Sequence, residues 1–212
     1  MSKENGVIYR ISGPVVTAVG ISPRMYEVVR VGDEGLMGEV IELHGDQSVI
    51  QVYEETSGVR PGEPVVRTGQ TLSVQLGPGL LTKIYDGIQR PLPELEKTMG
   101  VFIKRGVDAD GLDLEKIWAF NATAKKGDSV SSGDILGTVQ ETKTIEHKVM
   151  VPPGVSGKIK NINSGDFNVT QTVCTLEDGN EIQMMQKWPV RTPRPFTKKH
   201  APEVPLQTGQ RI

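Results

Sequence analysis

Apolar and polar residues alternate in short runs through the first third of the chain. The runs lie at residues 7–11, 15–19, 26–31, 37–43, 49–53 and 72–76. Breaks rich in glycine and aspartate separate them every roughly eight to twelve residues, which is typical of a small all-β barrel or sandwich. Since a closed barrel leaves no strand edge free to pair with another chain, we predict an N-terminal β-barrel over residues 1–76.

Residues 77–112 have a different pattern and are predicted to be a connector with short helices. After Gly77-Pro78-Gly79, the run 80–85 predicts one helical stretch that ends at Asp86-Gly87. Pro93 suits the first turn of a second short helix, and Gly100 suits its end.

Residues 113–186 return to a β pattern. Gly127-Asp128, Gly133-Asp134 and Gly165-Asp166 are each followed by an apolar run, and they lie on both sides of residues 149–153. Glycine supplies positive φ and aspartate bonds its own backbone, so these pairs predict turns before strands. The two halves resemble a barrel-sandwich hybrid, the fold of biotinyl and lipoyl carrier domains. The predicted fold class is therefore mainly β, a small N-terminal barrel followed by a barrel-sandwich-like domain.

Residues 187–212 are predicted to be an extended lead-in to a further domain. The segment is rich in proline, at Pro189, Pro193, Pro195, Pro202 and Pro205. Proline in this density favours an extended, loop-like path.

Composition excludes several classes of protein. The 212 residues carry 24 Lys and Arg against 26 Asp and Glu, a net charge of −2, which argues against a whole-chain nucleic-acid binder. The single cysteine, Cys174, excludes an internal disulfide, and its apolar neighbours predict a buried thiol. The sequence shows neither a signal-peptide core nor a membrane-spanning run, so we expect a cytoplasmic protein.

Catalytic motifs are missing from the sequence. It has no phosphate loop, no dinucleotide-binding glycine pattern and no serine nucleophile elbow. His44, His147 and His200 stand far apart, which favours isolated histidines over a metal site, and the pair Glu54-Glu55 is interpreted as solvated loop charges. We therefore predict no catalytic, cofactor-binding or metal-ligating residue in this chain.

Lys143 supports an alternative function. Carrier domains place a modified lysine at the hairpin tip between their two halves, and Lys143 lies at about that place. However, biotin sites carry Ala-Met-Lys-Met, whereas the chain has Glu141-Thr142-Lys143-Thr144, and lipoyl sites usually place aspartate where Thr142 stands. A biotinyl- or lipoyl-type carrier modified on Lys143 is therefore the alternative interpretation.

The segment 187–200 is basic. It contains Lys187, Arg191, Arg194, Lys198 and Lys199 and no acid. Trp188 and Phe196 are its only aromatic residues, so a linker that crosses an acidic neighbouring surface is favoured over a nucleic-acid site.

Several strings, in order along the chain, resemble the catalytic A subunit of archaeal-type (A/V-type) rotary ATPases. They are ISGPVV at 11–16, IQVYEETSG at 50–58, LGPGL at 76–80, YDGIQRPL at 85–92, HKVMVP at 147–152 and MMQKWPVR at 184–191. The resemblance implies an N-terminal barrel followed by a bulge domain. It also implies that Mg-ATP is bound by a nucleotide-binding domain that follows this sequence, so that the present segment holds no cofactor.

The resemblance further implies a structural and assembly role. In the family, barrels of alternating A and B subunits form a ring of six, and we expect the bulge to contact the peripheral stalks. The parent protein would couple ATP synthesis or hydrolysis to proton or sodium transport, peripheral to the cell membrane. The resemblance implies no nucleic-acid partner, and it implies that this segment does not insert into the membrane.

Overall fold

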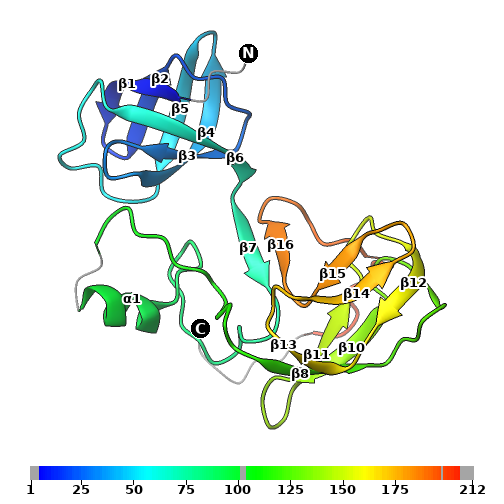
Figure 1. Cartoon of the computed structure of the whole chain (residues 1–212). Helices are drawn as coiled ribbons and strands as arrows, with labels where there is room; N and C mark the ends of the chain where they lie inside the picture. Colours follow the sequence, from blue (N-terminus) through cyan, green and yellow to red (C-terminus); the bar gives the residue numbers. More distant parts are fainter. Residues whose placement is uncertain (1–4, 101–103, 197, 206–212) are drawn as a thin grey trace.

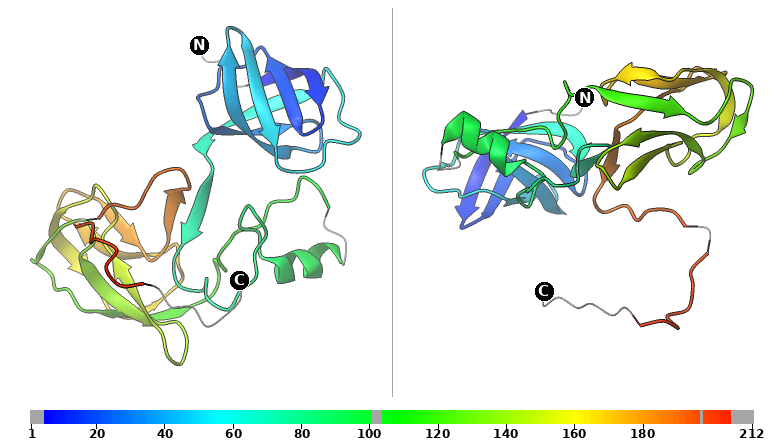
Figure 2. Two further views of the ribbon diagram at one scale, coloured as in Figure 1. Left: turned by 180° about the vertical axis from the view of Figure 1, so that it is seen from behind. Right: turned by 90° about the horizontal axis from the view of Figure 1, so that it is seen from below.

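The computed structural model describes residues 5–100, 104–196 and 198–205. Two β modules occupy separate regions, and the connector with its helix lies beside the first of them (Figure 1 and Figure 2). The accessible surface is 13596 Å², whereas a compact chain of this mass would expose roughly 9,700 Å². Two separate modules and the extended, exposed segment after β16 together account for the excess.

The first module is a closed barrel of six antiparallel strands. These are β1 (Asn5–Ser12), β2 (Val15–Val19), β3 (Glu27–Val31), β4 (Leu36–His44), β5 (Gln47–Val52) and β6 (Pro64–Thr71), in the order β1-β2-β5-β4-β3-β6. Alternate side chains fill the interior, so Ile8 is 2% exposed while its neighbours Val7 and Tyr9 point outward. The predicted barrel is confirmed.

The strand expected over 72–76 forms, but it lies outside the barrel. This strand, β7 (Ser73–Leu76), pairs with β16 (Gln186–Pro189) in a separate two-stranded sheet. The register between β3 and β6 shifts where Gly69 has a φ of 71°, and the backbone N–H of Gly69 donates to Glu27. A bulge of this kind bends a strand, and here it precedes the point where the chain leaves the barrel.

The connector contains one of its two expected helices. The helix α1 (Leu92–Met99) has proline in its first turn and ends at Gly100, as predicted. The helix predicted over 80–85 is wrong. Thr82 has a φ of 68°, and the backbone N–H groups of Gly79 and Leu81 donate to the carboxylate of Glu141, at 2.7 and 3.2 Å. A side chain from the second module therefore fixes this segment in a non-helical path.

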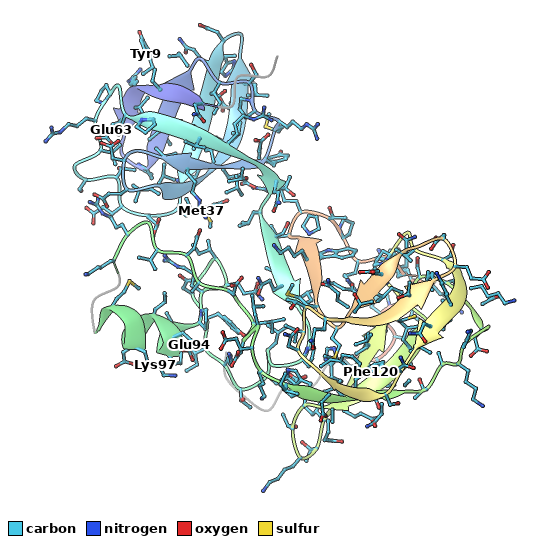
Figure 3. The ribbon with its side chains drawn as sticks, viewed as in Figure 1. Tyr9, Met37, Glu63, Glu94, Lys97 and Phe120 are labelled. Carbon is cyan, nitrogen blue, oxygen red and sulfur yellow. The ribbon has the colours of Figure 1, made fainter. Side chains whose placement is uncertain are left out.

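The second module consists of two four-stranded sheets and is called the sandwich below. Its strands are β8 (Trp118–Ala122), β9 (Ser129–Val130), β10 (Ile135–Gln140), β11 (Glu146–Met150), β12 (Gly157–Ile162), β13 (Gly165–Phe167), β14 (Thr172–Leu176) and β15 (Glu181–Gln183). The sheet orders are β11-β10-β8-β13 and β15-β14-β12-β9. Phe120, labelled in Figure 3, is 1% exposed in the core of the sandwich. The predicted barrel-sandwich fold is confirmed.

Two of the three predicted Gly-Asp turns are present. The carboxylates of Asp128 and Asp134 accept from the backbone N–H groups of Lys125 and Ser131, three residues earlier, and the preceding glycines have positive φ. The third prediction is wrong because Gly165-Asp166 lies within β13, paired with β8. Among the described residues, no helix has the length and apolar character needed to cross a bilayer.

Candidate functional site

The barrel meets the rest of the chain through arginine–carboxylate contacts, which we call the joint. The barrel supplies Arg30, Glu34, Glu39 and Glu54, and the segments outside it supply Arg90, Arg105, Asp108 and Arg191. Within the part of the chain that the structure describes, each buried apolar cluster lies wholly inside the barrel or wholly outside it. Polar contacts, and not a shared core, therefore set how the barrel sits on the connector.

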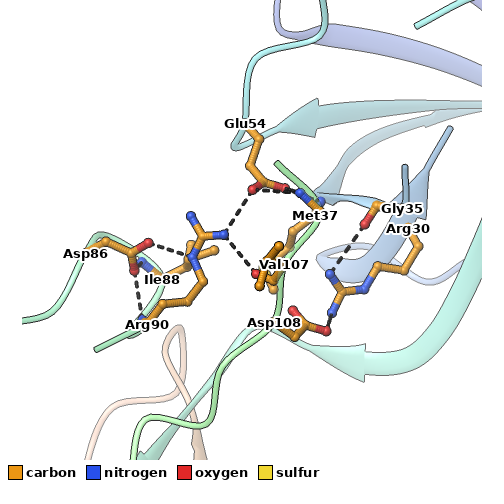
Figure 4. Close-up of polar contacts among 10 residues, drawn as sticks. Arg30, Gly35, Met37, Glu54, Asp86, Ile88, Arg90, Val107 and Asp108 are labelled. Carbon is orange, nitrogen blue, oxygen red and sulfur yellow. Dashed lines mark hydrogen bonds and ion pairs between the residues drawn. The ribbon is translucent and has the colours of Figure 1, made fainter. Parts of the chain in front are cut away.

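Arg90 is the centre of the joint (Figure 4). Its Nε donates to Asp86 at 2.7 Å, and its Nη1 donates to Glu54 at 3.0 Å and to the Val107 carbonyl at 2.9 Å. The side chains of Arg90 and Glu54 are 10% and 8% exposed. Burial alone would raise the pKa of Asp86, but hydrogen bonds from the Arg90 and Ile88 backbones and from the Arg90 side chain outweigh it and lower that pKa. Asp86 and Arg90 are therefore both charged at neutral pH.

Glu54 joins a barrel strand to the connector. Besides Arg90, its carboxylate accepts from the backbone N–H groups of Met37 in β4 and Gly106 in the connector, both at 3.2 Å. Gly106 has a φ of 71°, and a Cβ at this position would lie 2.0 Å from the carbonyl oxygen of Glu34. The connector can approach the barrel this closely because residue 106 is glycine.

Two further ion pairs of the joint are more exposed than Arg90–Glu54. Arg30 pairs with Asp108, and Arg105 pairs with Glu34 at 2.7 Å. One partner of each is well exposed, with 62% exposure of the Asp108 side chain and 51% of the Glu34 side chain. Solvent and salt therefore weaken these pairs more than they weaken Arg90–Glu54.

A third pair joins Arg191, just after β16, to Glu39 in β4, whose side chain is 2% exposed. The Arg191 guanidinium also stacks over the ring of Tyr26, at 4.4 Å, and Glu39 accepts from the Tyr53 hydroxyl at 2.9 Å. Burial would raise the pKa of Glu39, but hydrogen bonds from Arg191 and Tyr53 hold it below its usual value. Burial and the neighbouring carboxylate raise the pKa of Tyr53 to about 12.

The interpretation of Glu54-Glu55 as solvated loop charges is wrong for Glu54. Glu55 is exposed, but Glu54 is shielded and takes part in the joint. Its partner Arg90 stands 36 residues further along the chain, so spacing alone did not reveal the pair. Asp86 lies four residues before Arg90, but residues 86–90 form a turn, so the four-residue spacing that favours ion pairs on helices does not apply to this pair.

Lys143 lies in the exposed turn between β10 and β11, as its sequence position predicts. The turn is held at its base by Glu141, which bonds the connector and lies 3.4 Å from His147. Burial lowers the pKa of His147, and Glu141 opposes that shift. Modification of Lys143 stays a prediction.

The histidines are separate in space as well as in sequence. His44 pairs with Glu42 in β4, His147 lies beside Glu141, and His200 is in the extended segment after β16. The described residues contain no group of three or more His, Cys, Asp or Glu placed to hold a metal ion. Cys174 is 1% exposed, which confirms the predicted buried thiol, and burial raises its pKa.

The basic segment after β16 is extended and partly fixed (Figure 2). Arg194 stacks over Trp188 at 4.3 Å, and Arg191 reaches Glu39 of the barrel. The basic segment therefore contacts an acidic side chain through Arg191, and this side chain, Glu39, belongs to the same chain.

An apolar stripe runs over the outside of the barrel across β6, β1 and β2. It comprises Val66, Val7 and Tyr9, which are 39%, 45% and 60% exposed, with Val19 beside Val7. Tyr9 is the extra residue of a β-bulge, since Ile8 pairs with Ala18 and Arg10 pairs with Thr17. Tyr9 points away from the barrel into solvent (Figure 3). This stripe lies outside the joint and is free for contact with another molecule.

Comparisons with known proteins match both modules. The beta-barrel domain of the ATP synthase alpha/beta family matches residues 8–69, and the ATPsynthase alpha/beta subunit barrel-sandwich domain matches residues 109–191. The chain is 62% identical over 207 residues to the A subunit of the A-type ATP synthase of Methanosarcina barkeri, covering 98% of the chain. It is 64% identical over 214 residues to the corresponding protein of Methanoculleus marisnigri, covering 99% of the chain. The chain spans 36% of the length of each of these relatives.

Proposed function

Because this chain belongs to the ATP synthase alpha/beta family and matches the A subunit of A-type ATP synthases along nearly its whole length, we propose that it is the N-terminal assembly part of such a protein. Its role would be to hold the protein in a ring while the chemistry takes place in another part of it. The parent protein would synthesise or hydrolyse ATP and couple that reaction to proton or sodium transport. The complex would sit at the cytoplasmic side of the membrane, with this part not inserted.

The observation that carries the proposal is a closed barrel with an apolar stripe on its outer face. A closed barrel is stiff because every strand is paired on both edges, and it buries its own core. Val7, Tyr9 and Val66 are nevertheless exposed on neighbouring strands. Tyrosine is enriched among the energetically important residues of protein interfaces. The proposed occupant is the barrel of the adjacent B subunit in an alternating ring.

The sandwich is the part proposed to contact the peripheral stalks. Its hairpin β10–β11 projects beyond the sheet, and the turn exposes Lys143 and Ile145, the latter 45% exposed. Leu81, 41% exposed, lies beside the base of this hairpin because Glu141 bonds its backbone N–H. The exposed side chains of Ile145 and Leu81 offer a partner an apolar contact, and Lys143 and Glu146 beside Ile145 offer it charges of both signs.

Ring assembly tests the proposed role of the barrel. In the intact parent protein, Val7→Ser with Tyr9→Ser should reduce formation of rings with the B subunit, measured by native mass spectrometry. The matched control is Ile117→Ser, which removes a side chain that is 56% exposed outside the barrel. Equal ring formation by both variants would contradict the role of the stripe.

A second measurement tests where the nucleotide binds. We expect isothermal titration of the 212-residue chain with Mg-ATP to show no binding heat, since the proposal places that site in another part of the parent protein. Tight, stoichiometric binding would refute this assignment.

Intact mass after co-expression with a biotin or lipoyl ligase tests the alternative, because a carrier would gain the mass of the cofactor on Lys143.

A further inference from the structure

The barrel has few attachments to the rest of the chain. Within the described residues, the backbone leaves it at Thr71, where β6 continues through Leu72 into β7. The apolar clusters do not cross from the barrel to the connector or the sandwich. The orientation of the barrel therefore depends on this single backbone passage and on the polar contacts of the joint.

The ion pairs of the joint fall into two classes by exposure. Arg90–Glu54 is shielded, with side chains 10% and 8% exposed, and both groups have further hydrogen-bond partners. In Arg30–Asp108 and Arg105–Glu34, the carboxylate side chain is at least half exposed, at 62% and 51%. The third pair, Arg191–Glu39, lies between these classes, since Arg191 is 52% exposed and Glu39 only 2%. Salt screens exposed pairs strongly and shielded pairs weakly, so the two classes respond differently to ionic strength.

The structure also leaves room for movement beside the joint. A hollow of about 390 Å³ lies between the barrel and the connector. The barrel lines it with Arg30 and Thr68, and the connector lines it with Gln89 and Asp108. Because the exposed pair Arg30–Asp108 borders this hollow, weakening that pair would let the barrel tilt without displacing packed core side chains.

From these observations we propose that the joint is a salt-sensitive pivot. The shielded pair Arg90–Glu54 holds the barrel at one point, and the two exposed pairs limit how far it rocks about that point. Ionic strength then sets the range of barrel orientations relative to the sandwich. The inference concerns motion within this chain and does not rest on its role in a ring.

The test measures the distance between the two modules directly. Spin labels at Asp46→Cys in the barrel and Lys126→Cys in the sandwich occupy exposed loops, and the buried Cys174 stays unlabelled. Ionic strength is raised from about 0.01 M to about 1 M, which shortens the screening length from about 30 Å to about 3 Å. The distance distribution, measured by pulsed electron paramagnetic resonance, should broaden at least about twofold while far-UV circular dichroism stays constant.

Substitutions separate the two classes of pair. Arg105→Gln with Asp108→Asn removes two exposed pairs, together with the hydrogen bonds from Arg105 to the carbonyls of Glu55 and Ser57, and should give the broad distribution even at low salt. Glu54→Gln removes the shielded pair and should move the mean distance as well. The control Glu42→Gln removes a barrel carboxylate that is 59% exposed and outside the joint, and should match the wild type.

Two results would overturn the proposal. One is a distribution equally narrow at both salt concentrations in the chain that carries only the labels, a measurement that needs no substitution in the joint. The other is a Glu54→Gln variant that retains the wild-type mean and width.

Discussion

Replacing Arg90 by methionine tests how much the centre of the joint stabilises the fold. Methionine keeps much of the length and apolar stem of the side chain but removes the guanidinium. Hydrogen bonds to Asp86, Glu54 and the Val107 carbonyl are lost together. Two carboxylates whose side chains are 18% and 8% exposed then remain without their cation.

The expected loss of unfolding free energy depends on the hydrogen bonds that Asp86 and Glu54 keep after the substitution. Removing one partner of a buried pair costs about 3–5 kcal/mol, because the remaining charge is left unpaired. Asp86 still accepts from the backbone N–H groups of Ile88 and residue 90, and Glu54 still accepts from Met37 and Gly106. We therefore expect the lower end, a loss of about 3 kcal/mol, or roughly 150-fold in the unfolding equilibrium.

Arg90→Lys refines the prediction. Lysine keeps a positive charge but cannot bond three acceptors in the planar fork geometry of arginine, so the expected loss is about 1–2 kcal/mol. The assay is urea unfolding followed by far-UV circular dichroism, with Arg10→Met as the control because Arg10 is an exposed arginine on β1. If Arg90→Met were within about 1 kcal/mol of the wild type, the joint would not contribute as argued.

Three other outcomes are expected. Gly106→Ala should lower the free energy of unfolding in urea by about 2–4 kcal/mol, because the alanine Cβ would overlap the Glu34 carbonyl oxygen. The control Gly58→Ala should lower it by only about 1–2 kcal/mol, because residue 58 has a φ of 91° but no atom near the added Cβ. Phe120→Ala should cost about 3–5 kcal/mol and shift the transition reported by tryptophan fluorescence, since both tryptophans lie outside the barrel. The pKa of Tyr53, raised from 10.0 to about 12, stabilises the fold below pH 10, so stability should fall as the pH rises from 10 to 12 and fall less in Tyr53→Phe.

The features that the sequence predicted well depend on neighbouring residues. Alternation identified the barrel because side chains of a strand point to opposite faces, so Ile8 is buried between the exposed Val7 and Tyr9. The helix α1 followed from Pro93 and Gly100, which act on their own turn of backbone. The position of Lys143 followed from the strands directly before and after it.

The features that the sequence did not predict depend on distant residues. The segment 80–85 is held out of a helix by Glu141, which stands 62 residues after Gly79. The sequence predicts a solvated charge at Glu54 because no residue near it in the chain indicates that Arg90 covers it. The partner of β7 is β16, more than a hundred residues later. Propensity and periodicity carry no information about such contacts, and tertiary hydrogen bonds decide them.

The separation of cores and charges along this chain has a mechanical consequence. A shared apolar core would fuse the barrel and the sandwich into one rigid body, because close-packed side chains resist sliding. Here each module packs its own core, and arginine–carboxylate pairs join the barrel to the connector and to Arg191 after β16. Ion pairs can lengthen and re-form at little cost where they are exposed, but a shielded pair must stay intact or leave a buried charge. A chain built this way keeps each module stiff and concentrates its flexibility where the barrel meets the connector, so forces applied to one module turn it about Arg90 before they deform its core.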